Sequence, residues 1–294
     1  MRVLVEVSQG IGNCVQGTPL CHALWLLGHD VDLFVHREGD GAAQVAEMLR
    51  DWPVLGSVFT SRRQLQPRRY DFAVSCYGKH LLRRLFPPGL CISVVRTATL
   101  YQSETEANMR VARWLGFEGD TPPSHVGRSQ RQFNLGPRAV TVHAGCAHFA
   151  QEKRWPHWRE ICARVAAAGW RVVVVGTASD RSPENWEAAY ECHFDLGLRD
   201  LNALLSESSM HLGNDSGVGH MAAAAGLPGL ILYGPTSPVK NAPNCRVMRV
   251  MAAPRQGDEE HELTSRQPVP IGRLPLEVVW AEVEKLLAAP AKEP

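Results

Sequence analysis

The sequence of 294 residues lacks an excess of either charge, paired cysteines and long hydrophobic runs, and each absence excludes a class of protein. Its 31 basic and 30 acidic residues nearly cancel, so overall charge gives no reason to expect nucleic acid as a partner. The eight cysteines form no CxxC pair, which favours reduced thiols over a disulfide framework. The twelve histidines show no HExxH or similar spacing, so we expect no metal site. With no run of membrane-span length and a strand-like start, we expect a cytoplasmic protein without a transmembrane segment.

Alternating strand and helix signals divide the sequence into two α/β halves. In the first half, strands are predicted at 2–7, 31–35 and 70–75, with a turn over 8–13, a helix from there to 27, and helices at 42–49 and 104–115. Residues 118–137 are rich in Gly, Pro and charge and predict a linker. Strands at 139–143 and 170–175 follow, with helices at 155–168, 201–208 and 276–287. The simplest architecture is two doubly wound parallel sheets, with a ligand cleft beyond the carboxyl ends of their strands.

The most informative segment is 210–238, MHLGNDSGVGHMAAAAGLPGLILYGPTSP. Its pattern predicts a strand, a tight turn, a helix of small residues, a second strand and a rigid loop. Asn214, Asp215 and Ser216 are good N-cap residues, and Gly217 and Gly219 leave room for a ligand at the main chain. His220 lies one turn further along the same helix. The unpaired amides of a helix N-terminus attract anions, so the segment predicts a diphosphate site. The alternative is an ordinary strand–helix–strand unit with a capping Asp.

Three segments together resemble glycosyltransferase family 9, which includes the lipopolysaccharide heptosyltransferases. Residues 214–238 are similar to its signature D-[ST]-G-x-x-H-x-A-A-x-x-G-x-P, which ends in G-P-T-x-P. Residues 140–161 resemble its strand, phosphate loop and K-x-W-P helix start, and residues 3–20 its first strand, glycine loop and T-P helix start. Residues 103–116 are a weaker match to the helix that closes its first domain. The resemblance implies a GT-B fold, with an acceptor domain at 1–135 and a nucleotide-sugar domain at 136–294, both Rossmann-like.

The resemblance also implies roles for individual residues. Lys153 would neutralise the donor diphosphate, and Asp215 would hold hydroxyls of the donor sugar. Asp180 would reach the ribose, and the turn at 144–147 would add amides to the phosphate site. Alternative readings make Lys153 a surface lysine and His220 a satisfied core histidine. The residues expected to contact the donor are Gly12, Gly145, Cys146, Asp180, Ser216, Gly217, His220 and Thr236.

One position departs from the family's pattern. The usual S-x-G-D turn carries an Asp as the presumed general base, and this sequence has Gly12-Asn13 instead. An Asn side chain cannot take a proton, and loss of a positioned base slows an enzyme by about 10²–10⁴-fold. Glu6, Glu104 and Glu106 are alternative bases, or Asn13 only orients the acceptor.

The leading hypothesis is an inverting, metal-independent glycosyltransferase of lipopolysaccharide biosynthesis. It would move a heptose-like sugar from a nucleoside diphosphate donor such as ADP-heptose to a glycan, lipid-linked or protein acceptor, without a cofactor. Preorganised positive charge would stabilise the leaving diphosphate. Arginine pairs at 62–63, 68–69 and 83–84 leave open a contact with an acidic acceptor or a membrane surface, against a solvated surface as the alternative. Alternative functions are a weak or inactive nucleotide-sugar binding protein and a GT-B nucleotide-sugar 2-epimerase.

Overall fold

The computed structural model describes residues 1–8, 10–36, 40–76, 81–87, 89–94, 103–146, 150–181, 185–257 and 269–289. It divides the chain into two compact units, Met1–Arg128 and Ser129–Pro294. The division falls inside the predicted linker and before residue 135, because the chain that follows it already bonds to the second unit. Ser129 N donates to the Arg199 carbonyl, and the Glu207 carboxylate accepts from the backbone N–H groups of Phe133 and Leu135.

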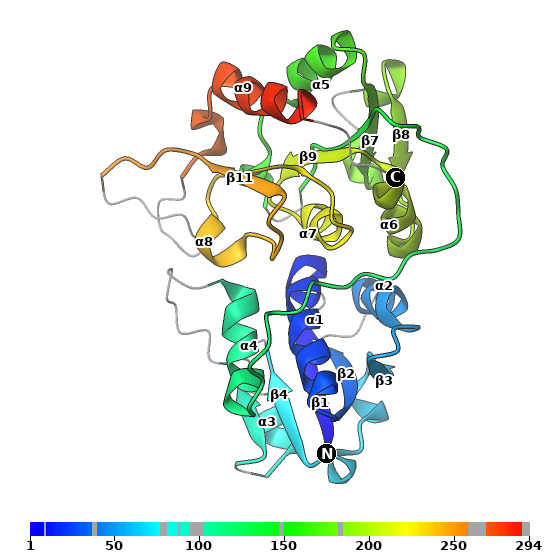
Figure 1. Cartoon of the computed structure of the whole chain (residues 1–294), viewed down its shortest axis with the longest axis vertical. Helices are drawn as coiled ribbons and strands as arrows, with labels where there is room; N and C mark the ends of the chain where they lie inside the picture. Colours follow the sequence, from blue (N-terminus) through cyan, green and yellow to red (C-terminus); the bar gives the residue numbers. More distant parts are fainter. Residues whose placement is uncertain are drawn as a thin grey trace. The chain divides into compact units, whose positions relative to one another are not determined.

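The described part of the first unit contains a parallel sheet in the strand order β3-β2-β1-β4-β5 (Figure 1). Its strands are β1 (Arg2–Ser8), β2 (Asp30–His36), β3 (Leu55–Phe59), β4 (Phe72–Ser75) and β5 (Cys91–Ser93). Its helices are α1 (Ile11–Leu26), α2 (Asp40–Leu49), α3 (Leu81–Leu85) and α4 (Glu104–Trp114), with short 3-10 turns η1 (Arg62–Gln64) and η2 (Pro67–Arg69). Helices separate the parallel strands and cover the sheet, so β1 and β2 are nearly continuous runs of buried residues.

The glycine segment after β1 is helical, and the predicted turn over 8–13 is wrong beyond Gly10. Helix α1 begins at Ile11, with Gly10 at the N-cap, so Asn13 lies in its first turn. The Ser8 hydroxyl accepts hydrogen bonds from Gly10 N at 3.1 Å and from Asn13 Nδ2 at 3.4 Å. This hydroxyl therefore links the end of β1 to the start of α1.

The helix start at Thr18-Pro19 that the family resemblance implied is not found, because both residues lie inside α1. Pro19 has no N–H for the carbonyl of Val15, four residues earlier. The Thr18 hydroxyl donates to that carbonyl at 2.7 Å. A local side-chain bond thus replaces the missing backbone bond, and the helix continues through the proline.

The described part of the second unit contains a parallel sheet in the order β11-β10-β9-β6-β7-β8 (Figure 1). Its strands are β6 (Ala139–His143), β7 (Arg171–Gly176), β8 (Glu191–Phe194), β9 (Met210–Asn214), β10 (Gly229–Tyr233) and β11 (Met248–Ala252). Its helices are α5 (Trp158–Ala167), α6 (Leu198–Glu207), α7 (Gly217–Ala224), α8 (Pro238–Asn241) and α9 (Leu276–Leu287). Its 3-10 turns are η3 (Gln151–Lys153), η4 (Ala178–Asp180), η5 (Trp186–Ala188) and η6 (Ile271–Arg273). Helices α5 and α9 cover one face of the sheet, and α6 and α7 cover the other.

Helix α5 begins three residues later than predicted, at Trp158 rather than Trp155. Pro156 disfavours the helical conformation for the residue before it. Trp155 is fixed instead by two bonds, from its Nε1 to the Leu274 carbonyl at 3.0 Å and from its backbone N to Asn214 Oδ1 at 3.3 Å. Lys153 consequently lies in η3, ahead of the helix. Among the described residues, none of the helices has the length and apolar character needed to cross a membrane.

Candidate functional site

Three polar side chains from separate segments meet beyond the carboxyl end of β9. Asp215 directly follows that strand, and its backbone N donates to the carbonyl of Leu232 in the neighbouring β10 at 2.9 Å. Asp215 Oδ2 accepts a bond from Lys153 Nζ at 2.6 Å and another from Thr236 Oγ1 at 2.6 Å. The Asp215 residue is only 6% exposed. The structure therefore brings together three of the predicted site residues, and Lys153 is not the isolated surface lysine of the alternative reading.

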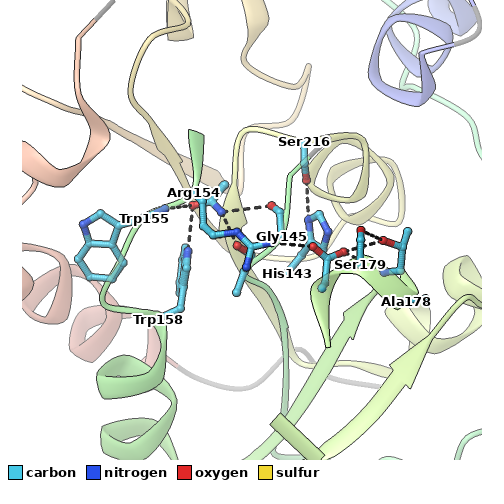
Figure 2. A network of polar contacts seen from close by, with 12 residues as sticks. His143, Gly145, Arg154, Trp155, Trp158, Ala178, Ser179 and Ser216 are labelled. Atoms are coloured by element: carbon cyan, nitrogen blue, oxygen red, sulfur yellow. Dashed lines mark hydrogen bonds and ion pairs between the residues drawn. The ribbon is translucent and has the colours of Figure 1, made fainter. Parts of the chain in front are cut away.

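Helix α7 starts beside this cluster, and its first backbone N–H groups make no hydrogen bond to the side chain of the N-cap residue. Ser216 is the N-cap residue, but among the described residues its side chain makes no capping bond to the helix. The Ser216 hydroxyl lies 2.9 Å from His143 Nδ1 instead, as Figure 2 shows. The amides from Gly217 onward carry the partial positive charge of the helix. This end of α7 is a place where an anionic group can bind.

His220 is buried in α7, close to the charged cluster. It is 5% exposed, and burial lowers the pKa of its ring to about 4, with Asp215 raising and Lys153 lowering it to smaller extents. The ring is therefore uncharged at neutral pH. Within the described part of the chain, His220 Nδ1 has no hydrogen-bond partner. His220 is thus a core histidine, but not a fully satisfied one, and a buried unpaired nitrogen costs free energy unless a ligand or water meets it.

The Asn214 amide connects several segments of the site through hydrogen bonds. The sequence predicted only a helix-capping role for this residue. It is fully buried at the end of β9. Its Oδ1 accepts from Trp158 Nε1 at 2.9 Å and from Trp155 N. Its Nδ2 donates to the carbonyls of Ala144 at 2.8 Å and Gly145 at 3.2 Å. One amide therefore links the loop after β6 to the start of α5, part of the network in Figure 2.

Asp180 lies in η4, and its carboxylate is occupied by internal bonds. Oδ1 accepts from an Arg154 guanidinium nitrogen at 3.0 Å, and Oδ2 accepts from both the backbone N and the hydroxyl of Thr177 at 2.9 Å. A Cβ placed on Gly145 would stand 2.2 Å from Asp180 Oδ1. Asp180 therefore packs against the bare backbone of Gly145 and holds two loops together. The ribose contact proposed for it stays a prediction.

The remaining predicted residues divide between the two units. Cys146 is buried beside Gly145, and burial raises the pKa of its thiol. Ala147, expected to add an amide to the phosphate site, lies outside the described residues. Gly12 and Asn13 belong to the first unit, where they form the first turn of α1.

The three alternative carboxylates of the first unit have different surroundings. Glu6 is fully buried in β1, and burial raises its pKa to about 7. Glu104 is buried in the first turn of α4. Glu106 lies in the same turn and accepts a bond from the Thr121 hydroxyl at 2.7 Å.

The sequence model of glycosyltransferase family 9 (heptosyltransferase) matches residues 90–269, which is more than half of the chain. The protein therefore belongs to glycosyltransferase family 9.

Solved structures of relatives match the fold over nearly the whole chain. A match in sequence to an individual relative covers a smaller part of it. Lipooligosaccharide heptosyltransferase 2 of Haemophilus influenzae is 31% identical over 145 residues, covering 43% of this chain and 42% of the relative. The chain thus spans about two fifths of the length of that relative. The family 9 glycosyltransferase of Veillonella parvula superposes with a TM-score of 0.76 at 15% identity, covering 97% of both chains. ADP-heptose lipopolysaccharide heptosyltransferase II of Escherichia coli gives 0.71 at 20% identity and 98% of both. The predicted GT-B fold is confirmed.

Proposed function

We propose that the protein is an inverting glycosyltransferase that moves a sugar from a nucleoside diphosphate to an acceptor hydroxyl. The donor we propose is ADP-heptose, because this nucleotide sugar appears in the name of the Escherichia coli structural relative. The second unit would bind the donor, and the first unit would bind a glycan or lipid-linked acceptor. Catalysis would take place in the cytoplasm, where nucleotide sugars are used, with peripheral contact to a membrane if the acceptor is a lipid.

The observation that carries the proposal is the cluster of Lys153, Asp215 and Thr236 beside the open N-terminus of α7. Sugar transfer builds negative charge on the departing diphosphate while the sugar becomes oxocarbenium-like. A lysine, a hydroxyl and helix N-terminal amides are donors that can stabilise such charge, and a fixed set of donors stabilises it most in a water-poor site. Asp215 holds Lys153 at 2.6 Å and so fixes where that positive charge lies. We propose that these groups take the place of a metal ion at the diphosphate.

The proposal is tested by the release of ADP from ADP-heptose, with and without a heptose-deficient lipopolysaccharide core as acceptor. Transfer requires both substrates. The Asp215→Asn variant should lose about 10²-fold or more in kcat/KM, because the lysine loses its charged partner in the site. The matched control is Asp200→Asn, which removes a carboxylate from an exposed pair with Arg131 in the same unit. Equal rates for both variants would contradict the assignment of the site.

The alternative functions are separate outcomes of the same assay. A binding protein would bind ADP-heptose and raise its thermal midpoint, but it would release no ADP even with acceptor present. A 2-epimerase would change the sugar without steady-state release of the nucleotide. The observation that favours the binding protein is Asn13, whose amide cannot accept the proton of an acceptor hydroxyl. Addition of a chelator should leave the rate unchanged if Lys153 and α7 supply the positive charge.

A further inference from the structure

The imidazole of His143 and the hydroxyl of Ser216 join two neighbouring segments of the second unit. His143 is the last residue of β6, and Ser216 is the N-cap residue of α7. His143 Nδ1 lies 2.9 Å from Ser216 Oγ, and Figure 2 shows the two side chains facing each other. His143 is only 6% exposed. A buried imidazole therefore holds the side chain at the start of the helix.

The strand register brings these two residues together. Strands β6 and β9 are parallel neighbours, and His143 is aligned with Gly213 near the end of β9. Ser216 follows Gly213 by three residues, in the turn that leads into α7. A Cβ on Gly213 would stand 3.0 Å from the His143 carbonyl oxygen and 3.5 Å from the His143 Cβ. A side chain at position 213 would therefore press against the end of β6, the part of the strand that carries His143.

The Ser216 hydroxyl does not have the usual partner of an N-cap side chain. Such a side chain accepts a bond from the second or third backbone N–H of its helix. Within the described residues, Ser216 makes no bond of this kind. The imidazole holds the hydroxyl instead, so the first N–H groups of α7 stay available to a ligand. A pair that served stability alone would gain little, because one hydrogen bond only replaces another.

A second, independent observation points to a ligand at this end of α7. His220 lies in the helix four residues after Ser216 and is 5% exposed. Its Nδ1 has no hydrogen-bond partner in the part of the chain that the structure describes, although buried ring nitrogens normally have one. The charges of Asp215 and Lys153 both affect the pKa of this ring, so it lies close to the charged cluster. A buried nitrogen without a protein partner favours a polar ligand at this position.

The protonation of the His143 ring decides what the Ser216 hydroxyl offers to a ligand. Burial lowers the pKa of the ring to about 4, while Asp180 raises it and Arg154 lowers it to smaller extents. The imidazole is therefore uncharged at pH 7 and carries one N–H. If this N–H is on Nε2, Nδ1 accepts the hydroxyl hydrogen, and only lone pairs of Ser216 Oγ face a ligand. If it is on Nδ1, the ring donates to Oγ, and the hydroxyl hydrogen is available to the ligand.

We propose that His143 positions the Ser216 hydroxyl as a hydrogen-bond donor to the diphosphate of the nucleotide sugar. The proposal rests on the proposed function, which puts that diphosphate at the N-terminus of α7. The N–H on His143 Nδ1 fixes the hydroxyl oxygen, and the hydroxyl hydrogen then meets a phosphate oxygen. The anion selects this tautomer, because oxygen lone pairs turned toward a phosphate would repel it. Ser216 contacts the substrate, and His143 is a positioning residue.

Titration calorimetry with ADP at pH 7 measures what the pair contributes to binding. Ser216→Ala should weaken ADP by about tenfold or more, because a hydrogen bond to a charged phosphate is lost. His143→Ala should weaken it by about threefold or more, and His143→Asn should bind like the wild type because its amide keeps an N–H near the place of Nδ1. The control is Ser206→Ala, whose lost hydroxyl donates to the Asn202 carbonyl and should not affect ADP.

Two further measurements separate a positioning role from a structural one. In a Ser216→Ala background, His143→Ala should change the affinity for ADP by less than about twofold, because its effect acts through the hydroxyl. Nitrogen-15 NMR of the ADP complex should show His143 Nδ1 protonated and Nε2 unprotonated. The signals are assigned by their absence from His143→Asn. An imidazole protonated on Nε2 in the complex would overturn the proposal.

The Lys153→Ala variant distinguishes a failure of this proposal from a failure of the proposed function. If the wild type does not bind ADP, or if Lys153→Ala binds it equally well, the proposed donor site is wrong and this proposal falls with it. If Lys153→Ala weakens ADP while Ser216→Ala does not, this proposal alone is overturned. Urea unfolding without ADP shows whether each variant is folded. If His143→Ala does not fold, Ser216→Ala and the NMR signals of the wild type decide the question.

Discussion

Replacing Gly145 by Ala should destabilise the second unit far more than a glycine substitution normally does. The added Cβ would stand 2.2 Å from Asp180 Oδ1, 2.4 Å from Cγ and 2.7 Å from Oδ2. Real Cβ atoms do not approach neighbours closer than 3.0 Å. The carboxylate therefore has to move by about 1 Å, in a close-packed region where side chains cannot yield freely.

The cost follows from what that movement breaks. Asp180 accepts one bond from Arg154 and two from Thr177, all at 2.9–3.0 Å. Hydrogen bonds to charged groups contribute about 1.5–3 kcal/mol each. Loss of two of them should lower the free energy of unfolding by about 3–6 kcal/mol. Urea unfolding at pH 7 measures this difference directly.

A second substitution tests the cause of the loss. In an Asp180→Ala background the clash is absent, so Gly145→Ala should then cost less than about 1 kcal/mol. Gly272→Ala is the control, because a Cβ at that position meets nothing within 4 Å. If the costs of Gly145→Ala and Asp180→Ala simply add, the contact between the two residues is not the reason for the glycine.

Further predictions concern the two units separately. The folded pKa of Glu6 is raised from 4.5 to about 7, so its protonated form stabilises the wild type below pH 4.5, and this contribution of up to about 3 kcal/mol is lost as pH rises through 7. Urea unfolding of Glu6→Gln across pH 4.5–8 should lack that decline, and a parallel decline would refute the assignment. Asn214→Asp sets a carboxylate against two carbonyls and should cost about 2–5 kcal/mol at pH 7, with part recovered at pH 4. The same midpoint at both pH values would contradict this. Asn13→Asp should raise the rate of transfer, because a carboxylate at that position can take the proton of the acceptor hydroxyl, and no gain would mean that the first turn of α1 faces away from the acceptor.

The second unit, which we propose binds the donor, is the part most open to prediction from the sequence. In 210–238, strand, helix and strand follow one another with capping residues and glycines at the joints, and the structure forms β9, α7 and β10 there. Lys153 meets Asp215 because its segment follows β6, the strand next to β9 in the sheet. The local strand–helix–strand pattern predicts these elements. The rule that ligands bind at the carboxyl ends of strands predicts where the site lies.

Other features depend on contacts between distant segments, which periodicity does not reveal. Glu6 is one polar residue in an apolar strand, and its partners His36 and Ser75 are 30 and 69 residues away. The sequence marked Glu6 as a possible base but gave no sign of the imidazole beside it. The start of α1 was misplaced because a glycine-rich segment suggests a turn. Helix α1 begins there instead, with Gly10 at its N-cap and the Ser8 hydroxyl accepting a bond from Gly10 N.

We propose that Lys153 and the N-terminus of α7 bind the diphosphate of a nucleotide sugar. Titration calorimetry of ADP and AMP against wild type and Lys153→Ala tests this binding, with Lys285→Ala at an exposed position as control. We expect Lys153→Ala to weaken ADP by about tenfold or more and AMP by less than about threefold, because only ADP carries the second phosphate. Lys285→Ala should leave both affinities unchanged. Equal weakening of ADP and AMP by Lys153→Ala, or no weakening of either, would contradict the account.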